Sequence, residues 1–303
     1  MLFPYPHGRA RRQPGCPPTV EDQGGLVDFR LQVIDYYDRH PINEARILAA
    51  LARRGKPAGT LAPEALFDLD QDHYGGLEAV EALARAAGIT GESRVLDVCA
   101  GLGGPARFLA RRYGCRVTGI DLTESRCRSA TALTRLVGLA PQVAFIRGDA
   151  SALPFASRSF TAVVSQEGWL HVTDKERCVR ECFRVLSPGG GLAFTDWTAG
   201  QKLSPRERSQ LRKWMAAAHV ESLDGYQQFL ARAGFVGIEA EDLAGEWRWI
   251  MRERLTKHRK LKEEGVARFG RAAYTEYTQL FAFFAGLVET GKIGGGRFRA
   301  TRP

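Results

Sequence analysis

Hydrophobic positions between residues 94 and 200 follow two alternating periods. Short apolar runs, typical of buried strands, lie at residues 95–98, 116–120, 143–146, 160–165 and 192–196. The segments 107–112, 125–137 and 175–186 instead repeat apolar positions every three or four residues, as one face of a helix does. Strands that alternate with helices predict a parallel sheet joined by crossover helices.

The flanking segments extend this pattern. Residues 26–53 have helical spacing with a break near residues 40–41, and residues 77–87 predict a further helix. After residue 200 we expect helices at 206–219, 225–233, 246–264 and 274–289, and strands at 236–240 and 297–301. Glycine-rich stretches at 187–191 and 294–296 are expected to lead into the fifth and the last strand. The predicted fold class is therefore α/β, with a seven-stranded, mostly parallel sheet and helices on both faces.

This fold class divides the chain into five predicted segments. Residues 1–25, rich in Arg, Pro and Gly, predict a disordered basic tail without the apolar stretch of a secretory signal. Residues 26–90 are expected to form an N-terminal helical cover and residues 91–245 the ligand-binding core. Residues 246–290 would form a helical lid, and residues 291–303 would return to the sheet as its last strand.

Composition adds three limits. A chain of 303 residues, 44% hydrophobic and 25% charged, has the length and composition of a soluble globular protein. Its apolar runs are too short to span a membrane, so we expect no membrane partner and a cytoplasmic location. The six cysteines form no C-x-x-C pair and predict reduced, buried thiols rather than a metal site.

Positive charge is concentrated toward the end of the chain. The formal net charge is +9, and residues 246–303 hold thirteen Lys or Arg against six Glu, a net of +7. A basic segment of this kind attracts an anionic substrate, a nucleic acid or a membrane surface, or simply forms a solvated helix face.

A glycine-rich loop follows the first predicted strand. Glycines at 101, 103 and 104 let a ligand approach the main chain, and Pro105 suits the first turn of the next helix. Gly101, Gly103 and Ala106 also fit a dinucleotide-binding fingerprint, and a tight turn that binds nothing is the plainest alternative. The ligand must therefore be identified from other positions.

Carboxylates end three consecutive strands. Asp121, after the second strand, is placed to accept hydrogen bonds from both ribose hydroxyls of a nucleotide. Asp97 would sit poorly beside a pyrophosphate but well beside an ammonium or sulfonium group, and Asp149 is placed to accept from an adenine amino group. These positions favour S-adenosylmethionine over a nicotinamide cofactor.

Together with residues 117–121, 147–154 and 186–191, the loop resembles the motifs of class I S-adenosylmethionine-dependent methyltransferases, whose core is a Rossmann-like sheet. Within that class, residues 103–107 (Gly-Gly-Pro-Ala-Arg), 165–171 and 71–76 resemble the small-molecule branch. That branch includes sarcosine/dimethylglycine N-methyltransferases and tocopherol or phosphobase methyltransferases. The basic, tryptophan-bearing stretch at residues 247–262 departs from the glycine-derivative enzymes.

The resemblance implies roles for individual residues. Gly101 and Gly103 would pack against the methionine part of S-adenosylmethionine, with Asp97 near its amino group. Asp121 would hold the ribose, Leu122 would flank the adenine, and Asp149 with the backbone of Ala150 would contact the adenine edge. The expected cofactor site is completed by Ala100, Gln166 and Tyr37.

Methyl transfer from a sulfonium is an in-line displacement, so the protein mainly aligns the acceptor and excludes water. The expected catalytic residues are Glu167, His171 and Tyr74. Residues expected to contact the acceptor are Trp169, His73, Arg107 and Trp197. Several have plainer interpretations: His171 as a helix cap, and Trp169 as part of the core.

We therefore expect a methyltransferase that acts on a small molecule, by N-methylation of an amine or by C- or O-methylation of a metabolite with an anionic group. An RNA methyltransferase that uses the basic segment, and a non-catalytic S-adenosylmethionine-binding protein, are the alternatives. A nucleic-acid partner is disfavoured because no separate RNA-binding module is found, and a homodimer is left open.

Overall fold

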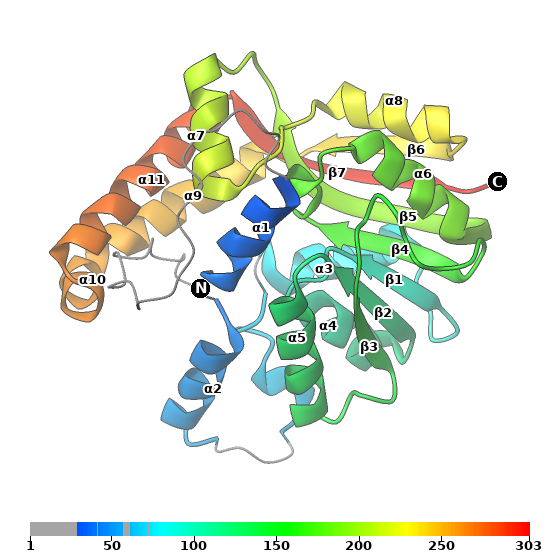
Figure 1. Ribbon diagram of the computed structural model, residues 1–303, viewed down its shortest axis with the longest axis horizontal. Helices are drawn as coiled ribbons and strands as arrows, with labels where there is room; N and C mark the ends of the chain where they lie inside the picture. Colours follow the sequence, from blue (N-terminus) through cyan, green and yellow to red (C-terminus); the bar gives the residue numbers. More distant parts are fainter. Residues whose placement is uncertain (1–28, 41, 57–60, 72) are drawn as a thin grey trace.

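In the described part of the chain, seven strands form one sheet in the order β3-β2-β1-β4-β5-β7-β6 (Figure 1). The structure, a computed structural model, describes residues 29–40, 42–56, 61–71 and 73–303; the predicted tail at residues 1–25 lies outside them. The strands are β1 (Arg94–Val98), β2 (Arg116–Asp121), β3 (Val143–Arg147), β4 (Phe160–Gln166), β5 (Leu186–Ala199), β6 (Val236–Asp242) and β7 (Ile293–Thr301). Strands β1 to β5 pair in parallel, and β7 runs antiparallel to both β5 and β6. The predicted fold class is confirmed.

Helices cover both faces of the sheet. They are α1 (Phe29–Asp38), α2 (Glu44–Arg53), α3 (Gly76–Ala86), α4 (Gly104–Tyr113), α5 (Glu124–Leu136), α6 (Lys175–Val185), α7 (Pro205–Met215), α8 (Leu223–Ala233), α9 (Ala244–Lys260), α10 (Lys262–Phe269) and α11 (Arg271–Glu289), with short turns η1 (Pro63–Ala65) and η2 (Trp169–His171). Side-chain caps define several starts: Asp174 caps α6, and Ser204 and Glu207 form a capping box on α7.

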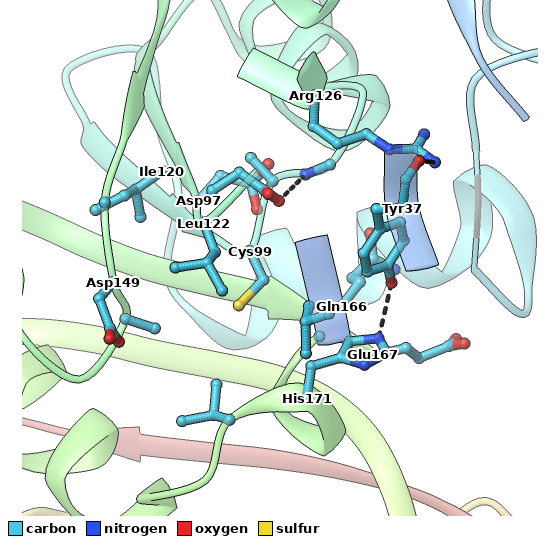
Figure 2. A pocket seen from close by; sticks show the side chains of 18 of the residues that line it. Tyr37, Asp97, Cys99, Ile120, Leu122, Arg126, Asp149, Gln166, Glu167 and His171 are labelled. Carbon is cyan, nitrogen blue, oxygen red and sulfur yellow. Dashed lines mark hydrogen bonds between the residues drawn. The ribbon is translucent and has the colours of Figure 1, made fainter. Parts of the chain in front are cut away.

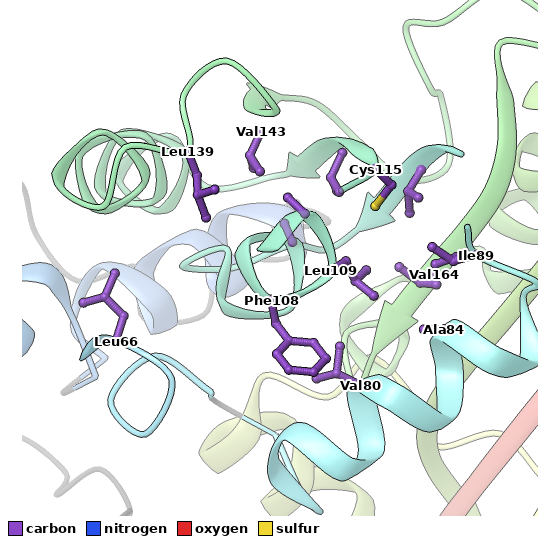
Figure 3. Packing of buried hydrophobic residues seen from close by; sticks show 14 of the residues in the cluster. Leu66, Val80, Ala84, Ile89, Phe108, Leu109, Cys115, Leu139, Val143 and Val164 are labelled. Carbon is purple, nitrogen blue, oxygen red and sulfur yellow. The ribbon is translucent and has the colours of Figure 1, made fainter. Parts of the chain in front are cut away.

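Two apolar clusters flank the sheet because successive strand residues point to opposite faces. Val95 of β1 joins the cluster under α3 and α4, in which Val80 and Leu109 pack together (Figure 3). Its neighbour Leu96 joins the cluster under α6 and α8. The sheet is thus buried on both sides, as parallel sheets generally are.

Two expected connections are part of strands instead. The stretch at residues 187–191 was expected to be a turn, but it is a bulged part of β5, where the register with β4 shifts between Phe160 and Ala162. Gly294, Gly295 and Gly296 were expected to precede the last strand, but they pair with β5 as residues of β7. A Cβ on Gly295 would lie 2.2 Å from the Trp247 ring, so these glycines let α9 lie close against the strand.

Helices α9, α10 and α11 follow β6 and extend to one side of the sheet (Figure 1). The inner faces of α9, which carries Trp247, and α11 form a third cluster with Trp197 of β5. Helix α1 lies between these helices and the sheet, where Phe29 and Val33 form a small separate cluster with Ala216. The ligand-binding end of the sheet therefore lies beneath α1.

Candidate active site

A pocket opens at the carboxyl ends of β1, β2, β3 and β4 (Figure 2). Ligands of open α/β sheets bind at this end of the strands. Predicted site residues among its walls are Tyr37, His73, Asp97, Ala100, Gly101, Asp121, Leu122, Asp149, Ala150, Gln166, Glu167 and His171. The structure thus brings most of the sequence-predicted site together.

Asp97 is the most unusual group in the pocket. Its side chain is only 2% exposed, and its Oδ2 has no hydrogen-bond partner. Burial, reinforced by the charge of Asp121, raises the pKa of Asp97 to about 7, although Arg107 opposes the increase. A buried carboxylate without a partner is costly. The site is therefore suited to a ligand that brings a cation or an N–H donor to this oxygen.

Asp121 fixes the glycine loop. Its Oδ2 accepts a hydrogen bond from the Gly101 N–H at 2.9 Å, and its Oδ1 accepts from the Thr123 N–H at 2.8 Å. Burial raises the pKa of Asp121, and these backbone donors oppose the increase. Carboxylate oxygens have further lone pairs, so Asp121 can still accept from a ligand hydroxyl.

The two glycines that were expected to contact the cofactor differ. Gly101 has a φ of +54°, lines the pocket, and would have no atom within 4 Å of an added Cβ. Gly103 has a φ of +76°, but a Cβ there would lie 2.2 Å from the Phe145 ring, and Gly103 is not among the pocket walls. The expected cofactor contact of Gly103 is therefore corrected: its small size serves packing against Phe145.

Asp149 lies at the end of the pocket away from Tyr37 and Glu167, just beyond β3 (Figure 2). Its Oδ1 accepts from the backbone and hydroxyl of Ser151 at 2.8 and 2.6 Å, and its Oδ2 lies 3.3 Å from an Arg30 guanidinium nitrogen of α1. Burial alone would raise the pKa of Asp149, but the hydrogen bonds from Ser151 and Arg30 outweigh it and lower the pKa. Asp149 is therefore held as a carboxylate.

Tyr37 of α1 and His171 of η2 form a hydrogen bond across the pocket (Figure 2). The Nδ1 of His171 lies 2.9 Å from the carbonyl oxygen of Ala216, which can only accept, so Nδ1 carries a proton. In the neutral ring Nε2 then accepts from the Tyr37 hydroxyl, 2.7 Å away. The Arg126 guanidinium lies over the face of the Tyr37 ring, 4.9 Å from its centroid. The imidazole of His171 and the phenol of Tyr37 therefore face the pocket together.

Glu167 stands at a strained position beside them. It has a φ of +53°, its N–H donates to the Thr195 carbonyl at 2.8 Å, and its Oε1 accepts from the Tyr74 N–H at 2.6 Å. Non-glycine residues in this conformation are uncommon and occur often at functional sites. Glu167 links the strand end to the segment at residues 73–74, which also places His73 in the wall beside Gln166.

Four expected contacts with the reacting groups are corrected. Arg107 is fully buried and forms an ion pair with Asp70 at 2.7 Å, and its remaining N–H groups bond to the Leu102 and Ala130 carbonyls and the Thr134 hydroxyl. Trp169 is fully buried and stacks on Phe194.

Trp197 and Tyr74 are 3% and 5% exposed and pack in an aromatic group with Trp247, and the Tyr74 hydroxyl donates to the Met251 sulfur. None of Arg107, Trp169, Trp197 and Tyr74 is among the pocket walls. Each contributes to packing behind the pocket instead.

Sequence reasoning missed several pocket residues. Cys99 and Ile120 adjoin predicted strand ends and could have been found from that position. Arg30, Val33 and Arg126 come from helices α1 and α5, and no local pattern indicates which face of a helix lies over a distant strand end.

Comparisons with known proteins identify the fold's relatives. A family described as "Methyltransferase domain" matches residues 96–194. The methyltransferase GfsG of Streptomyces halstedii is 30% identical over 233 residues, which cover 76% of this chain and 82% of that relative. The chain belongs to the class I S-adenosylmethionine-dependent methyltransferases. The resemblance inferred from its motifs is confirmed.

Other relatives of this methyltransferase are longer. The glycine/sarcosine/dimethylglycine N-methyltransferase of Actinopolyspora halophila is 36% identical over 168 residues, 54% of this chain and 29% of that relative. Phosphoethanolamine N-methyltransferase 2 of Haemonchus contortus, solved with phosphomonomethylethanolamine and S-adenosylhomocysteine, has a TM-score of 0.75 at 23% identity, covering 92% of this chain and 61% of that one. The likeness to the second protein shows a shared fold, and the chain spans less than two thirds of either.

The site of this methyltransferase fits the family's cofactor, S-adenosylmethionine. The unpartnered Oδ2 of Asp97 suits the cofactor's amino group, and the open space at Gly101 leaves room for its methionine part. A dinucleotide would bring its pyrophosphate toward the buried carboxylate of Asp97, which disfavours a nicotinamide cofactor. Within the described part of the chain, no helix is both long and apolar enough to cross a membrane.

Proposed function

We propose that this methyltransferase transfers a methyl group from S-adenosylmethionine to the nitrogen of a small amine that also carries an anionic group. The observation that carries the proposal is the hydrogen bond between the Tyr37 hydroxyl and His171 Nε2 in the pocket wall. The names of two of the three relatives reported above support this substrate class over RNA, because they name glycine derivatives or phosphoethanolamine as substrates. They equally favour an enzyme over a non-catalytic binding protein.

Three carboxylates would hold the cofactor. Asp97 would receive its amino group, Asp121 its ribose and Asp149, with the backbone of Ala150, its adenine edge. When bound, the cofactor supplies a methyl group already activated on a sulfonium. Helix α1 covers the pocket and would exclude water while the acceptor is aligned.

His171 would remove the proton that an amine acceptor carries at neutral pH. Because Nδ1–H is held by the Ala216 carbonyl, the Nε2 lone pair is directed toward the Tyr37 oxygen and the pocket. An ammonium at this position can pass its proton to the Tyr37 oxygen as the hydroxyl proton moves to Nε2. Glu167, whose Oε1 is bonded to the Tyr74 N–H, would supply negative charge that attracts the ammonium.

The test replaces the two partners separately, as Tyr37→Phe and His171→Asn. Methylation of phosphoethanolamine, glycine and sarcosine is measured with labelled cofactor, and binding of S-adenosylhomocysteine is measured by calorimetry. We expect kcat to fall about 10²- to 10⁴-fold, the usual contribution of acid–base catalysis, while the Kd changes less than about threefold. Unchanged kcat in both variants, or no turnover of any amine by the wild type, contradicts the proposal.

Arg254 of the lid is the residue we propose for the anionic group. Its guanidinium lies 4.3 Å above the Tyr74 ring and 3.5 Å from the His73 carbonyl, beside the pocket wall, whereas Arg252 pairs with Glu289 of α11. We expect Arg254→Gln to raise the KM for phosphoethanolamine about tenfold or more, as loss of a charged hydrogen bond does. Arg252→Gln is the matched control and should leave the KM unchanged; equal effects of the two would refute the assignment.

A cytoplasmic location is part of the proposal, supported by the free thiols of the five described cysteines.

A further inference from the structure

The loop between β4 and α6 carries the proposed base, His171, and is held from behind by buried charge. Gly168, His171, Val172 and Thr173 of this loop line the pocket. One backbone bond joins the loop to the segment after α7: the Ala218 N–H donates to the Leu170 carbonyl at 2.8 Å. Two charged side chains that do not line the pocket bond to backbone atoms of Leu170 and Val172, the residues on either side of His171.

Asp196 of β5 holds one side. It is fully buried, and its Oδ1 accepts from the Leu170 N–H at 3.2 Å, while its Oδ2 accepts a short hydrogen bond from the Tyr226 hydroxyl. Burial raises the pKa of Asp196 to about 6, and the charge of Lys175 opposes the increase.

Lys175, the first residue of α6, holds the other side. It is 2% exposed, its Nζ donates to the Val172 carbonyl at 2.8 Å, and the same nitrogen lies 3.5 Å from Nδ1 of His219. Burial lowers the pKa of Lys175 to about 8, and the charge of Asp196 opposes the decrease. Each group therefore helps to keep the other charged inside the protein.

Buried charges of this kind are weak contributors to stability, because apolar side chains of the same volume often serve as well or better. Here the carboxylate of Asp196 accepts from the N–H of Leu170, the residue before His171, and the ammonium of Lys175 donates to the carbonyl of Val172, the residue after it. The arrangement constrains the backbone at the one residue whose ring must reach both the Ala216 carbonyl and the Tyr37 hydroxyl. Misplacement of a catalytic group by about 1 Å can cost roughly 10²-fold in rate.

We propose that Lys175 and Asp196 are positioning residues that fix the ring of His171 in its Nδ1–H form, hydrogen-bonded to Tyr37, without contacting the acceptor or the cofactor. The proposal rests on the proposed function for its effect on rate. Its effect on the His171 ring is independent of any acceptor and can be measured separately.

The direct test reads the His171 ring by NMR in protein labelled with ¹⁵N-histidine. The chain has six histidines, so the His171 signals are assigned by their loss in His171→Asn. Wild-type His171 should show a single Nδ1–H tautomer near pH 7, where Lys175 keeps its charge. In Lys175→Met and Asp196→Asn, which preserve side-chain volume, we expect a mixture of tautomers. Arg177→Met, an exposed position two residues along α6, is the matched control and should leave the signals unchanged.

Activity and binding then separate positioning from general damage. In both variants kcat should fall about tenfold or more, while the acceptor KM and the Kd of S-adenosylhomocysteine stay within about threefold. An equal loss of cofactor affinity, or an unchanged His171 spectrum in either folded variant, overturns the proposal. If wild-type protein methylates no amine, the proposed function fails, but the spectra still decide the positioning role. If Asp196→Asn does not fold, Lys175→Met decides alone.

Discussion

At the scale of one residue, the unpartnered Oδ2 of Asp97 lowers the folding stability but gives the ligand a binding partner. Burial raises the pKa of Asp97 from 3.8 to about 7. A carboxyl group whose pKa is higher in the folded state contributes stability that is fully present below pH 3.8 and is lost as pH rises toward about 7. At neutral pH and above, the ionised side chain therefore destabilises the protein until a cationic partner binds.

Asp97→Asn should reverse this balance. Without cofactor, we expect its free energy of unfolding near pH 8 to exceed that of the wild type by roughly 2–4 kcal/mol, because each pKa unit corresponds to about 1.4 kcal/mol. The difference should shrink as pH falls toward 4. Affinity for S-adenosylhomocysteine should fall about 10- to 100-fold, as expected for loss of a charged hydrogen bond. Urea unfolding and calorimetry measure both quantities.

Wild-type binding should depend on pH for the same reason. Below about pH 7 the cofactor must displace a proton from Asp97, so its affinity should fall up to about tenfold per pH unit. Asp97→Asn should lack this dependence, and an exposed carboxylate changed in the same way, Asp224→Asn, should retain it. A flat wild-type profile would show that Asp97 does not receive the cofactor's amino group.

Glycines in β7 govern a contact at the scale of elements, where α9 meets the sheet. A Cβ on Gly295 would lie 2.2 Å from the Trp247 ring. The first turn of α9 can therefore lie this close to β7 only because residue 295 has no side chain. Trp247 also packs on Tyr74, whose backbone N–H is bonded to Glu167. Docking of α9 therefore reaches the pocket wall through two contacts.

Gly295→Val should displace α9 from the strand. We expect a loss of about 1–3 kcal/mol in the free energy of unfolding, the usual cost of overpacking, together with faster hydrogen exchange in α9. Gly286→Ala is the control: its Cβ would meet nothing within 4 Å in α11, and removing a helical glycine should stabilise by about 0.5–1 kcal/mol. If Gly295→Val were as stable as the wild type, the close approach of α9 would not be required.

The sequence predicted the helices and strands better than it predicted which of their side chains contact each other. Strand ends can be located from periodicity, and parallel strands share one edge, so Asp97, Asp121 and Asp149 were expected together and line one pocket. Arg107 and Trp169 were misassigned because a residue next to a ligand loop can point away from the ligand. The sequence shows the spacing of Arg107 but not its buried partner Asp70, 37 residues earlier.

At the scale of the whole molecule, the sequence shows least about which distant residues come into contact. The sheet order follows from short parallel crossovers, whereas the position of α1 depends on contacts with residues far along the chain. Phe29 and Val33 pack on Ala216, and Tyr37 bonds to His171. Periodicity predicts that such a helix exists, but not where it lies. The sequence therefore placed Tyr37 among the cofactor-binding residues without indicating that it bonds to His171.

We expect helix α1 to be the part of the molecule that moves for cofactor exchange, because its residues line the pocket. It closes over the pocket, yet its apolar contacts form a small cluster separate from those that hold the sheet, supplemented by Arg30 with Asp149 and Gln32 with the Arg212 carbonyl. Regions with few buried contacts open at a free energy well below that of global unfolding. Residues 29–38 should therefore exchange amide hydrogens faster than α4. Bound S-adenosylhomocysteine should slow that exchange, because α1 then stays closed over the ligand.

Phe29→Ala tests this opening directly. Phe29 is 7% exposed at the centre of the cluster, whereas Leu31, two residues along the same helix, is 60% exposed. Removing a buried phenylalanine costs about 3–5 kcal/mol in a rigid core. In a helix that opens locally we expect this cost to appear as a roughly tenfold or greater increase in the dissociation rate of S-adenosylhomocysteine, measured by stopped-flow fluorescence, with little change in global unfolding. Leu31→Ala should change the rate less than twofold. Equal rates in the two variants, or a full loss of global stability in Phe29→Ala, would mean that α1 is part of the core and that the cofactor leaves by another route.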